Sequence, residues 1–302
     1  MAPPRVDPLT SGSRPLRVRI YLGDWPAVHP WWPGSPPSVA RLIAGQLAAE
    51  GASVTVPGTP APEGGVDVEL SLDPDGRFSE GAARLRAIAQ VHAQPVGLDD
   101  SDAWHECWWP ARALQLGVDR CYLSTPPGWS PAISPPAPSA GYVAIIADWR
   151  LGPGLFELLQ LAFRCTSLPF LVLSPNPQPI ALPTHVRWLQ PPSLPEFLRL
   201  LAPAVAVLAG MHDEGTAGCL LAPGLAGMLG VPVVGSSHLP GDLLSATIEE
   251  GMSGFVVGGW EPVLPYLLHA AGLDRLRIQG RATERAAASN GGRVDAWRRR
   301  LE

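Results

Sequence analysis

Short apolar runs separated by longer amphipathic segments make up most of this chain. In its second half, apolar runs occupy residues 205–209, 231–234 and 254–257. Runs of this length are too short for helices and are typical of parallel strands buried on both faces. Similar runs, or strict alternation, predict further strands at residues 16–22, 52–56, 66–72, 91–97, 118–123, 141–147, 170–173 and 186–189.

The amphipathic segments between the runs predict helices. Ser38 is suited to N-cap a helix over residues 38–50, and Gly51 is suited to end it. Pro195 falls in the first turn of a short helix over residues 193–201, where its missing N–H leaves no hydrogen bond unmade. Further helices are predicted at residues 79–90 (with its arginines facing solvent), 101–117, 155–164, 263–271, 274–288 and 293–302.

A proline-dense segment divides the chain at residues 124–139. Clustered prolines stiffen a segment and are typical of linkers. Strands alternate with helices on both sides of it, which is the pattern of α/β domains. We therefore expect an α/β fold of two Rossmann-like domains that face a cleft. The proline-rich residues 1–15 are expected to form a disordered tail.

Charge and composition narrow the possible functions. Only 16 % of the residues are charged and the net charge is −5, which argues against nucleic acid or an anionic membrane as partner. All 22 basic residues are arginine, which excludes Schiff-base lysine chemistry and a phosphate-binding P-loop. No apolar run is long enough to span a membrane, and no signal peptide is visible. We expect a cytoplasmic protein, and the arginine-rich, lysine-free composition suggests a GC-rich bacterial genome.

Cysteine and tryptophan offer weaker indications. The four cysteines form no Cys-x-x-Cys pair, so neither a zinc ribbon nor a dithiol redox site is indicated, and reduced buried thiols are expected. Acidic residues with metal-ligand spacing are also missing, so no metal site is predicted. Two tryptophan pairs, Trp31-Trp32 and Trp108-Trp109, fit either core packing or stacking on flat ligands such as sugars.

The stretch around Glu214 is the most informative part of the sequence. The strand at residues 205–209 is followed by a loop that contains Glu214 and Gly215, and then by a helix. Gly215, Thr216, Ala217 and Gly218 occupy the junction between loop and helix. Free backbone amides and the positive end of the helix dipole make such a junction a natural seat for an anion.

The order of these elements resembles the donor-binding half of a GT-B glycosyltransferase, most closely family 4. The matching residues are Glu214-Gly215, the Gly-x-Pro-Val-Val strand at 230–234, Leu239-Pro240, and Glu250-Gly251 followed by Gly-Phe-Val-Val at 254–257. The resemblance covers residues 141–260 and is weak before them. It implies an acceptor domain at residues 16–135, a donor domain at 136–280, and a C-terminal helix at 281–302 that crosses back to the first domain.

The resemblance also implies roles for particular residues. Glu214 would hold the hydroxyls of the transferred sugar, and it otherwise reads as a solvated loop carboxylate. Arg150 lies where the family has its phosphate clamp and would bind the diphosphate, although a surface arginine capping a helix fits the position equally well. His92 resembles a family histidine beside the reacting sugar, or it is a buried, hydrogen-bonded histidine. His212 would shape the donor pocket or lie on the surface.

Two family features are missing. The second glutamate, which binds the donor ribose, is replaced by Ala222, or by Leu225 if the helix is aligned backwards from Gly230. The clamp lysine is also absent. The resemblance implies a retaining, metal-independent transferase that needs no cofactor beyond a nucleotide-sugar donor and a small-molecule acceptor. The two losses favour the alternative, a degenerate glycosyltransferase fold that serves as a non-catalytic binding or partner module.

Overall fold

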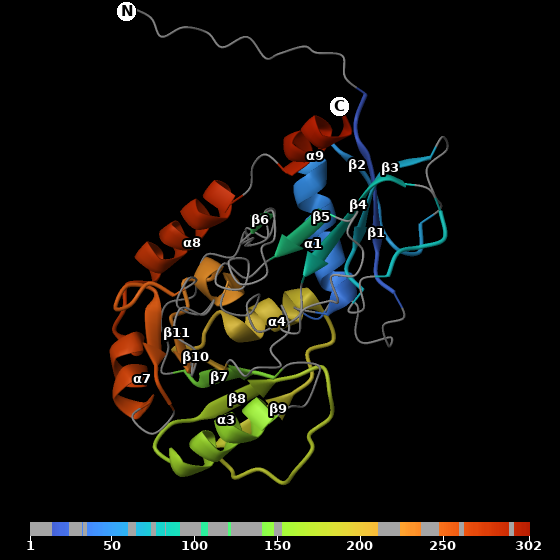
Figure 1. The fold of residues 1–302 in the computed structure, drawn as a ribbon. Helices are drawn as coiled ribbons and strands as arrows, with labels where there is room; N and C mark the ends of the chain where they lie inside the picture. The colour runs from blue at the N-terminus through green and yellow to red at the C-terminus, as the bar shows by residue number, and fades with distance from the viewer. Residues whose placement is uncertain are drawn as a thin grey trace, which may run out of the picture.

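The chain folds around two parallel β-sheets, seen at the top and the bottom of Figure 1. The structure is a computed structural model. It describes residues 14–23, 32, 35–59, 65–73, 77–81, 83–90, 104–107, 120–121, 141–147, 153–210, 224–236, 248–259, 263–289 and 293–302. The predicted α/β class with two parallel sheets is confirmed. Residues 1–13 of the predicted tail 1–15 and the linker at 124–139 lie outside the described residues, so the predicted domain boundaries stay predictions. Arg14, at the end of that predicted tail, is placed and donates to the Asp67 carboxylate.

The first sheet has the strand order β2-β1-β3-β4-β5-β6, and every pair is parallel. Its strands are β1 (Arg17–Tyr21), β2 (Ser53–Thr55), β3 (Val66–Ser71), β4 (Ala83–Gln90), β5 (Trp104–Cys107) and β6 (Arg120–Cys121). Alternation in β1 places Val18 and Ile20 in the core and Arg17 and Arg19 on the opposite face. The same alternation in β3 buries Val68 and Leu70 beside them.

Helix α1 (Pro36–Ala49) packs its Val39, Ile43 and Leu47 into the apolar core of the first sheet. The helix was predicted, but the predicted N-cap is wrong: Ser38 lies inside the first turn, and Ser35 caps the helix. The Ser35 hydroxyl accepts the N–H of Ser38 at 3.4 Å and the Ser35 carbonyl accepts that of Val39 at 2.9 Å, so the chain enters the helix at Ser35. Pro36 can occupy the first helical position because no intrahelical N–H bond is needed there. Gly51 (φ +84°) ends the helix as predicted.

Two predicted helices of the first half are wrong. Residues 83–90 of the predicted helix 79–90 form strand β4, and residues 104–107 of the predicted helix 101–117 form strand β5. In β4, Leu85 and Ala87 are buried while Arg84 and Arg86 are exposed, which is a period of two. Alanine, arginine and leucine favour helices, but pairing with β3 and β5 overrides that preference.

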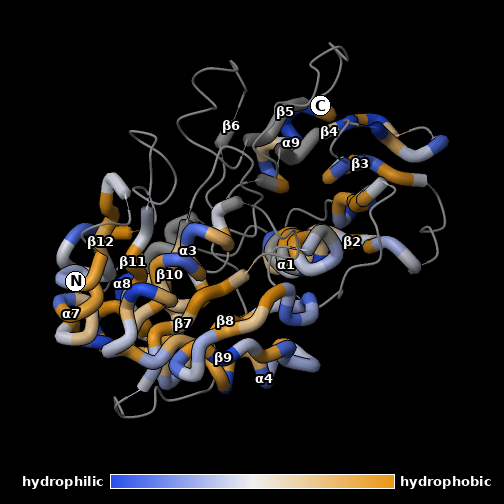
Figure 2. The backbone as a smooth tube through the Cα atoms, turned by 90° about the horizontal axis from the view of Figure 1, so that it is seen from below, coloured by the Kyte–Doolittle hydropathy of each residue, from blue (hydrophilic) through white to orange (hydrophobic). Residues whose placement is uncertain are grey.

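The second sheet has the order β12-β11-β10-β7-β8-β9 and is also parallel throughout. Its strands are β7 (Val143–Ile146), β8 (Phe170–Leu173), β9 (Val186–Leu189), β10 (Ala206–Gly210), β11 (Val233–Ser236) and β12 (Gly254–Val257). All six confirm predicted strands. They read as continuous apolar runs, drawn largely in orange in Figure 2, because helices cover both faces of the sheet.

Helices α3 (Pro153–Arg164) and α7 (Val263–Ala271) cover one face of the second sheet through Leu158, Leu159 and Leu267. Helix α4 (Leu194–Leu201) and the helical residues 224–228 cover the other face. Ser193 caps α4 by accepting the N–H of Glu196 at 3.4 Å, with a proline in the first turn as predicted. None of the helices in the described part of the chain has the length and apolarity needed to cross a membrane.

The last two helices join the two halves. Helix α8 (Arg275–Ser289) runs toward the first sheet, and α9 (Arg293–Leu301) lies beside α1 (Figure 1). Val294 and Trp297 of α9 are buried in the same core as α1. The N–H of Val294 donates to the Glu50 carboxylate at 2.8 Å, and Arg84 of β4 donates to the Leu301 carbonyl at 3.2 Å. The C-terminal end of the chain therefore completes the first half of the molecule.

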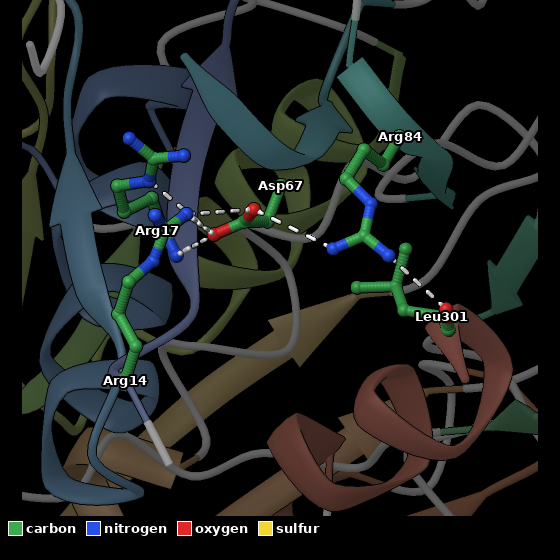
Figure 3. Close-up of polar contacts among 5 residues, drawn as sticks. All are labelled: Arg14, Arg17, Asp67, Arg84 and Leu301. Atoms are coloured by element: carbon green, nitrogen blue, oxygen red, sulfur yellow. Dashed lines mark hydrogen bonds and ion pairs between the residues drawn. The ribbon is translucent and has the colours of Figure 1, made fainter. Parts of the chain in front are cut away.

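Charged side chains line the face of the first sheet opposite α1. Asp67 and Glu69 of β3 lie on this face and are buried, although alternation in a strand usually exposes such residues. Arginines pair with them: Arg17 and Arg14 contact Asp67, and Arg19 contacts Glu69 at 3.3 Å. Figure 3 shows the group around Asp67, which Arg84 connects to the end of α9. Among the described residues, ion pairs occupy this face of the first sheet.

Candidate functional site

The strand order of the second sheet places a topological switch point between β7 and β10. From β7, the chain adds β8 and β9 on one side, then returns to add β10, β11 and β12 on the other. Connections on the two sides of such a point leave in opposite directions, and ligands of open α/β sheets bind at the carboxyl ends of the strands there. β7 and β10 are direct neighbours, with Ile145 paired to Leu208. The candidate site is this carboxyl edge.

The loops that carry most predicted site residues begin at these two strands. β7 ends at Ile146, and the loop with Arg150 follows. β10 ends at Gly210, and the segment with His212, Glu214 and residues 215–218 follows. Arg150, His212, Glu214, Gly215, Thr216, Ala217 and Gly218 themselves lie outside the described residues, so their roles stay predictions. What the sheet establishes is that the segments carrying these residues follow adjacent strands at the switch point.

Helical residues 224–228 follow the second of these loops and lead into β11. The helix ends at Gly230, whose φ of +73° suits glycine, and the N–H of Val231 donates to the Ala226 carbonyl at 2.8 Å. Arg275 of α8 donates from Nε to the Gly230 carbonyl at 3.2 Å and from Nη2 to that of Ala202. These contacts fix the turn before β11. Gly230, the first glycine of the Gly-x-Pro-Val-Val motif, is therefore explained by its backbone conformation in this turn.

Gly254 of the Gly-Phe-Val-Val motif also has a structural reason. A Cβ atom on Gly254 would lie 1.9 Å from the Val233 carbonyl oxygen of β11, so only glycine fits. The turn before it is closed by Glu250, whose carboxylate accepts the N–H of Val256 at 3.0 Å. The Gly-Phe-Val-Val motif therefore forms β12, the edge strand of the sheet, and Gly254 has a packing role in it.

Sequence reasoning missed a serine at the candidate site. Ser236 ends β11 and is 2 % exposed, and its hydroxyl oxygen has no hydrogen-bond partner among the described residues. Ser174, directly after β8, is also buried, but its hydroxyl accepts the N–H of Asn176 at 3.1 Å. The only signal for Ser236 in the sequence was its place two residues after the apolar run 231–234. The strand order was needed to show that Ser236 lies on β11, the strand that pairs directly with β10.

The carboxyl edge of the first sheet carries a second set of polar residues. His92 lies outside the described residues, as does the strand predicted over 91–97, but β4 ends at Gln90, so His92 follows this edge. Gly23 follows β1 with φ +68°, and a Cβ atom there would overlap the Asp73 carboxylate. Asp73, 3 % exposed, accepts the Arg77 N–H at 3.4 Å. Asp73 was not predicted as a site residue.

Trp32 links the two halves next to this edge. It is fully buried, and its ring meets that of Phe197 of α4 edge-on with centroids 5.2 Å apart. Figure 1 shows α4 lying below α1, which begins at Pro36, shortly after Trp32 in the sequence. For Trp32 the packing interpretation is therefore confirmed, because a fully buried ring offers no face to a sugar. Trp31, Trp108 and Trp109 lie outside the described residues.

Two titratable groups with shifted pKa values, Tyr142 and Cys165, lie just before β7 and just after α3, away from the candidate carboxyl edge. Burial raises the pKa of the Cys165 thiol, which therefore stays protonated at neutral pH, as expected of a structural cysteine. Burial also raises the pKa of Tyr142, against the nearby charges of Arg199 and Arg187, and its hydroxyl donates to the Leu200 carbonyl. Within the described ranges, no three His, Cys, Asp or Glu side chains gather as metal ligands do.

Comparison with known proteins identifies the fold. No family model and no curated protein sequence matches the chain. Among solved structures, AviGT4, a glycosyltransferase involved in avilamycin A biosynthesis, superposes with a TM-score of 0.66 at 18 % identity, covering 95 % of this chain and 98 % of its own. A glycosyltransferase from Rickettsia africae ESF-5 gives 0.60 at 9 % identity, covering 95 % and 97 %. The lipopolysaccharide outer core galactosyltransferase WaaB gives 0.57 at 11 % identity, covering 91 % and 99 %. This chain therefore has the GT-B glycosyltransferase fold.

Proposed function

We propose that this protein is a retaining, metal-independent glycosyltransferase that moves a sugar from a nucleotide-sugar donor to a small-molecule acceptor. The observation that carries the proposal is the switch point, where the loops with Arg150 and Glu214 begin at the paired strands β7 and β10. Likeness to glycosyltransferases over 95 % of the chain agrees with it. Because AviGT4 is a glycosyltransferase of avilamycin A biosynthesis, a secondary metabolite is our proposed acceptor class.

The proposed chemistry uses few charged groups. The leaving diphosphate accumulates negative charge as the glycosidic bond breaks, and Arg150 and the amides of residues 215–218 stabilise it. Glu214 orients the sugar by accepting hydrogen bonds from its hydroxyls. Arginine suits the diphosphate because its fork of N–H donors binds two oxygens at once, and this chain contains no lysine to do so. His92, after β4, is proposed to contact the reacting sugar from the first sheet.

The second candidate function is a non-catalytic binding or partner module with the same fold. The missing second glutamate and the missing lysine favour it, because both would contact the donor. A buried hydroxyl that finds no partner among the described residues at the carboxyl edge favours a ligand-binding site over a module that binds only protein partners. Nucleotide binding separates the two candidates.

The test of the proposed function is a binding panel followed by a turnover assay. We expect UDP, GDP, ADP or dTDP to raise the melting temperature of the full chain, because a ligand that binds only the folded state stabilises it. Hydrolysis or transfer of the matching nucleotide sugar should then be unchanged by EDTA. Loss of activity in EDTA and recovery with Mn²⁺ would contradict metal independence. A chain that binds no nucleotide in calorimetry would instead support the partner module.

Arg150→Ala should weaken nucleoside diphosphate binding by about ten- to a hundredfold, the loss expected for a hydrogen-bonded charged contact. Glu214→Gln should leave diphosphate affinity unchanged and lower turnover, because it weakens only the contacts to sugar hydroxyls. Calorimetry and initial rates measure the two effects. Arg164→Ala is the matched control, since Arg164 is exposed at the far end of α3 and should change neither quantity. Equal affinity of Arg150→Ala and wild type would show that the phosphate site lies elsewhere.

A further inference from the structure

The hydroxyl of Ser236 is a buried polar group that no part of the described chain satisfies. A hydroxyl carries one donor and two acceptor positions, and leaving it unpaired in the interior is unfavourable. Within the described residues, the other buried side-chain atoms without partners are Arg19 Nε and Glu69 Oε2, and these two side chains already pair with each other through other atoms at 3.3 Å. Ser236 has no second polar side-chain atom, so its side chain makes no polar contact with the described residues.

The strands beside Ser236 explain why they leave it unpaired. In the sheet register Ser236 lies level with Gly210 of β10 on one side and with Val257 of β12 on the other. Glycine has no side chain and valine has no polar atom, so neither neighbouring side chain can accept or donate. Gly210 has no Cβ atom next to Ser236, and a glycine within a strand often marks the close approach of another group.

The same register places Ser236 at the candidate site. Gly210 is the last residue of β10, and the segment with Glu214 and residues 215–218 begins immediately after it. Ser236 is therefore level with the start of the loop that forms the proposed anion seat. Because the chain has no lysine, a bound diphosphate depends on Arg150 and on neutral donors such as amides and hydroxyls. A buried hydroxyl is a donor of this kind.

We infer that the Ser236 hydroxyl donates a hydrogen bond to the diphosphate of the nucleotide-sugar donor. The inference rests on the proposed function and assigns a further donor-binding residue to that site. Donor binding supplies the hydrogen-bond partner that the described residues do not provide. Strand β11 fixes the position of Ser236, whereas Arg150 and Glu214 lie outside the described residues.

Ser236→Ala tests the inference by calorimetry with the nucleoside diphosphate that binds the wild type most tightly among UDP, GDP, ADP and dTDP. Affinity for the diphosphate should fall by about ten- to a hundredfold, as expected for a hydrogen bond to a charged acceptor. Affinity for the corresponding nucleoside should not change. The melting temperature of the ligand-free variant should not fall, because the mutation removes a hydroxyl that makes no hydrogen bond before the donor binds.

Ser174→Ala is the matched control. It also removes a buried serine hydroxyl after a strand of the same sheet, but one that accepts the Asn176 N–H at 3.1 Å. It should lower the melting temperature and leave diphosphate affinity unchanged. Wild-type affinity in Ser236→Ala, or an equal loss for the nucleoside, would overturn the inference while leaving the proposed function in place. A wild-type chain that binds none of the four diphosphates would overturn the proposed function and the inference together.

Discussion

Replacing Asp67 with alanine should lower the free energy of unfolding by about 3 kcal/mol, at the lower end of the loss seen when a buried ion pair is broken. The Asp67 carboxylate accepts the Arg17 N–H at 2.9 Å and the Arg14 guanidinium at 3.2 and 3.3 Å, and lies 4.0 Å from that of Arg84 (Figure 3). Arg14 and Arg84 are each 63 % exposed and can turn to solvent, which keeps the loss below that of a fully buried group.

The contribution of Asp67 should depend on pH. Burial of the Asp67 carboxyl raises its pKa, but hydrogen bonds from the backbone and side chain of Arg17, and from Arg14, outweigh burial and hold the pKa below its ordinary value. A depressed folded-state pKa stabilises the fold above the unfolded pKa of about 3.9, and this stabilisation is lost as the pH falls through the folded value. The difference in melting temperature between wild type and Asp67→Asn should therefore shrink on acidification below about pH 4.

Asp295→Ala is the control for Asp67→Ala. Asp295 pairs with Arg298 at 3.4 Å within α9 and is 65 % exposed, so its removal should change the free energy of unfolding by no more than about 0.5 kcal/mol. Urea or thermal unfolding at pH 7 measures both variants. Equal, small losses for the two would mean that the charged face of the first sheet contributes no more than an ordinary surface pair.

Gly254→Ala should be the other strongly destabilising substitution. The added Cβ would lie 1.9 Å from the Val233 carbonyl oxygen, 2.9 Å from its carbon and 3.0 Å from the Val233 nitrogen. All three are backbone atoms of β11, the strand to which Gly254 is paired, so no side-chain rotation relieves the contact. Strand β12 has to move away, at a cost of about 3 kcal/mol or more. At roughly 2–4 °C per kcal/mol, the melting temperature should fall by about 6–12 °C.

Gly258→Ala is the matched control for Gly254→Ala. Gly258 follows the same strand, but a Cβ there meets no atom within 4 Å and its φ is not in the left-handed range. Its substitution should stay within about 0.5 kcal/mol of wild type, as expected for a surface position. If both variants have the melting temperature of the wild type, the close approach of β12 to β11 does not exclude a Cβ atom at position 254. If only Gly254→Ala has a lower melting temperature, packing against β11 is sufficient to explain why glycine occupies this position of the Gly-Phe-Val-Val motif.

The second sheet was predictable from the sequence almost residue by residue. Strands buried on both faces are uniform apolar runs, and those at 170–173 and 186–189 match β8 and β9 to the residue. Ser193 and Pro195 likewise marked the start of α4, because capping and proline at the first turn are local effects. Glycine and acidic residues after a strand also have a local signature, and on it the candidate loops are predicted; they lie outside the described residues and stay predictions.

The first sheet was less predictable because its sequence signals conflict. Residues 83–90 consist of good helix formers yet alternate as a strand, and only pairing with β3 and β5 decides between the two. Asp67 and Glu69 read as solvent-facing positions of an alternating strand. Their burial depends on arginines of β1 and β4, which are far away in sequence, and on the Arg84 contact to α9.

By itself the sequence determined the α/β class, the strands of the second sheet and the cap of α4, because hydrophobic period, capping and turn chemistry act over a few residues. Only the tertiary structure decided the strand order, and with it the switch point, the neighbours of Ser236 and the packing of α9 on the first sheet. These features depend on which strands become neighbours. Which strands pair depends on how apolar surface is buried over the whole chain, and a local sequence pattern does not contain that information.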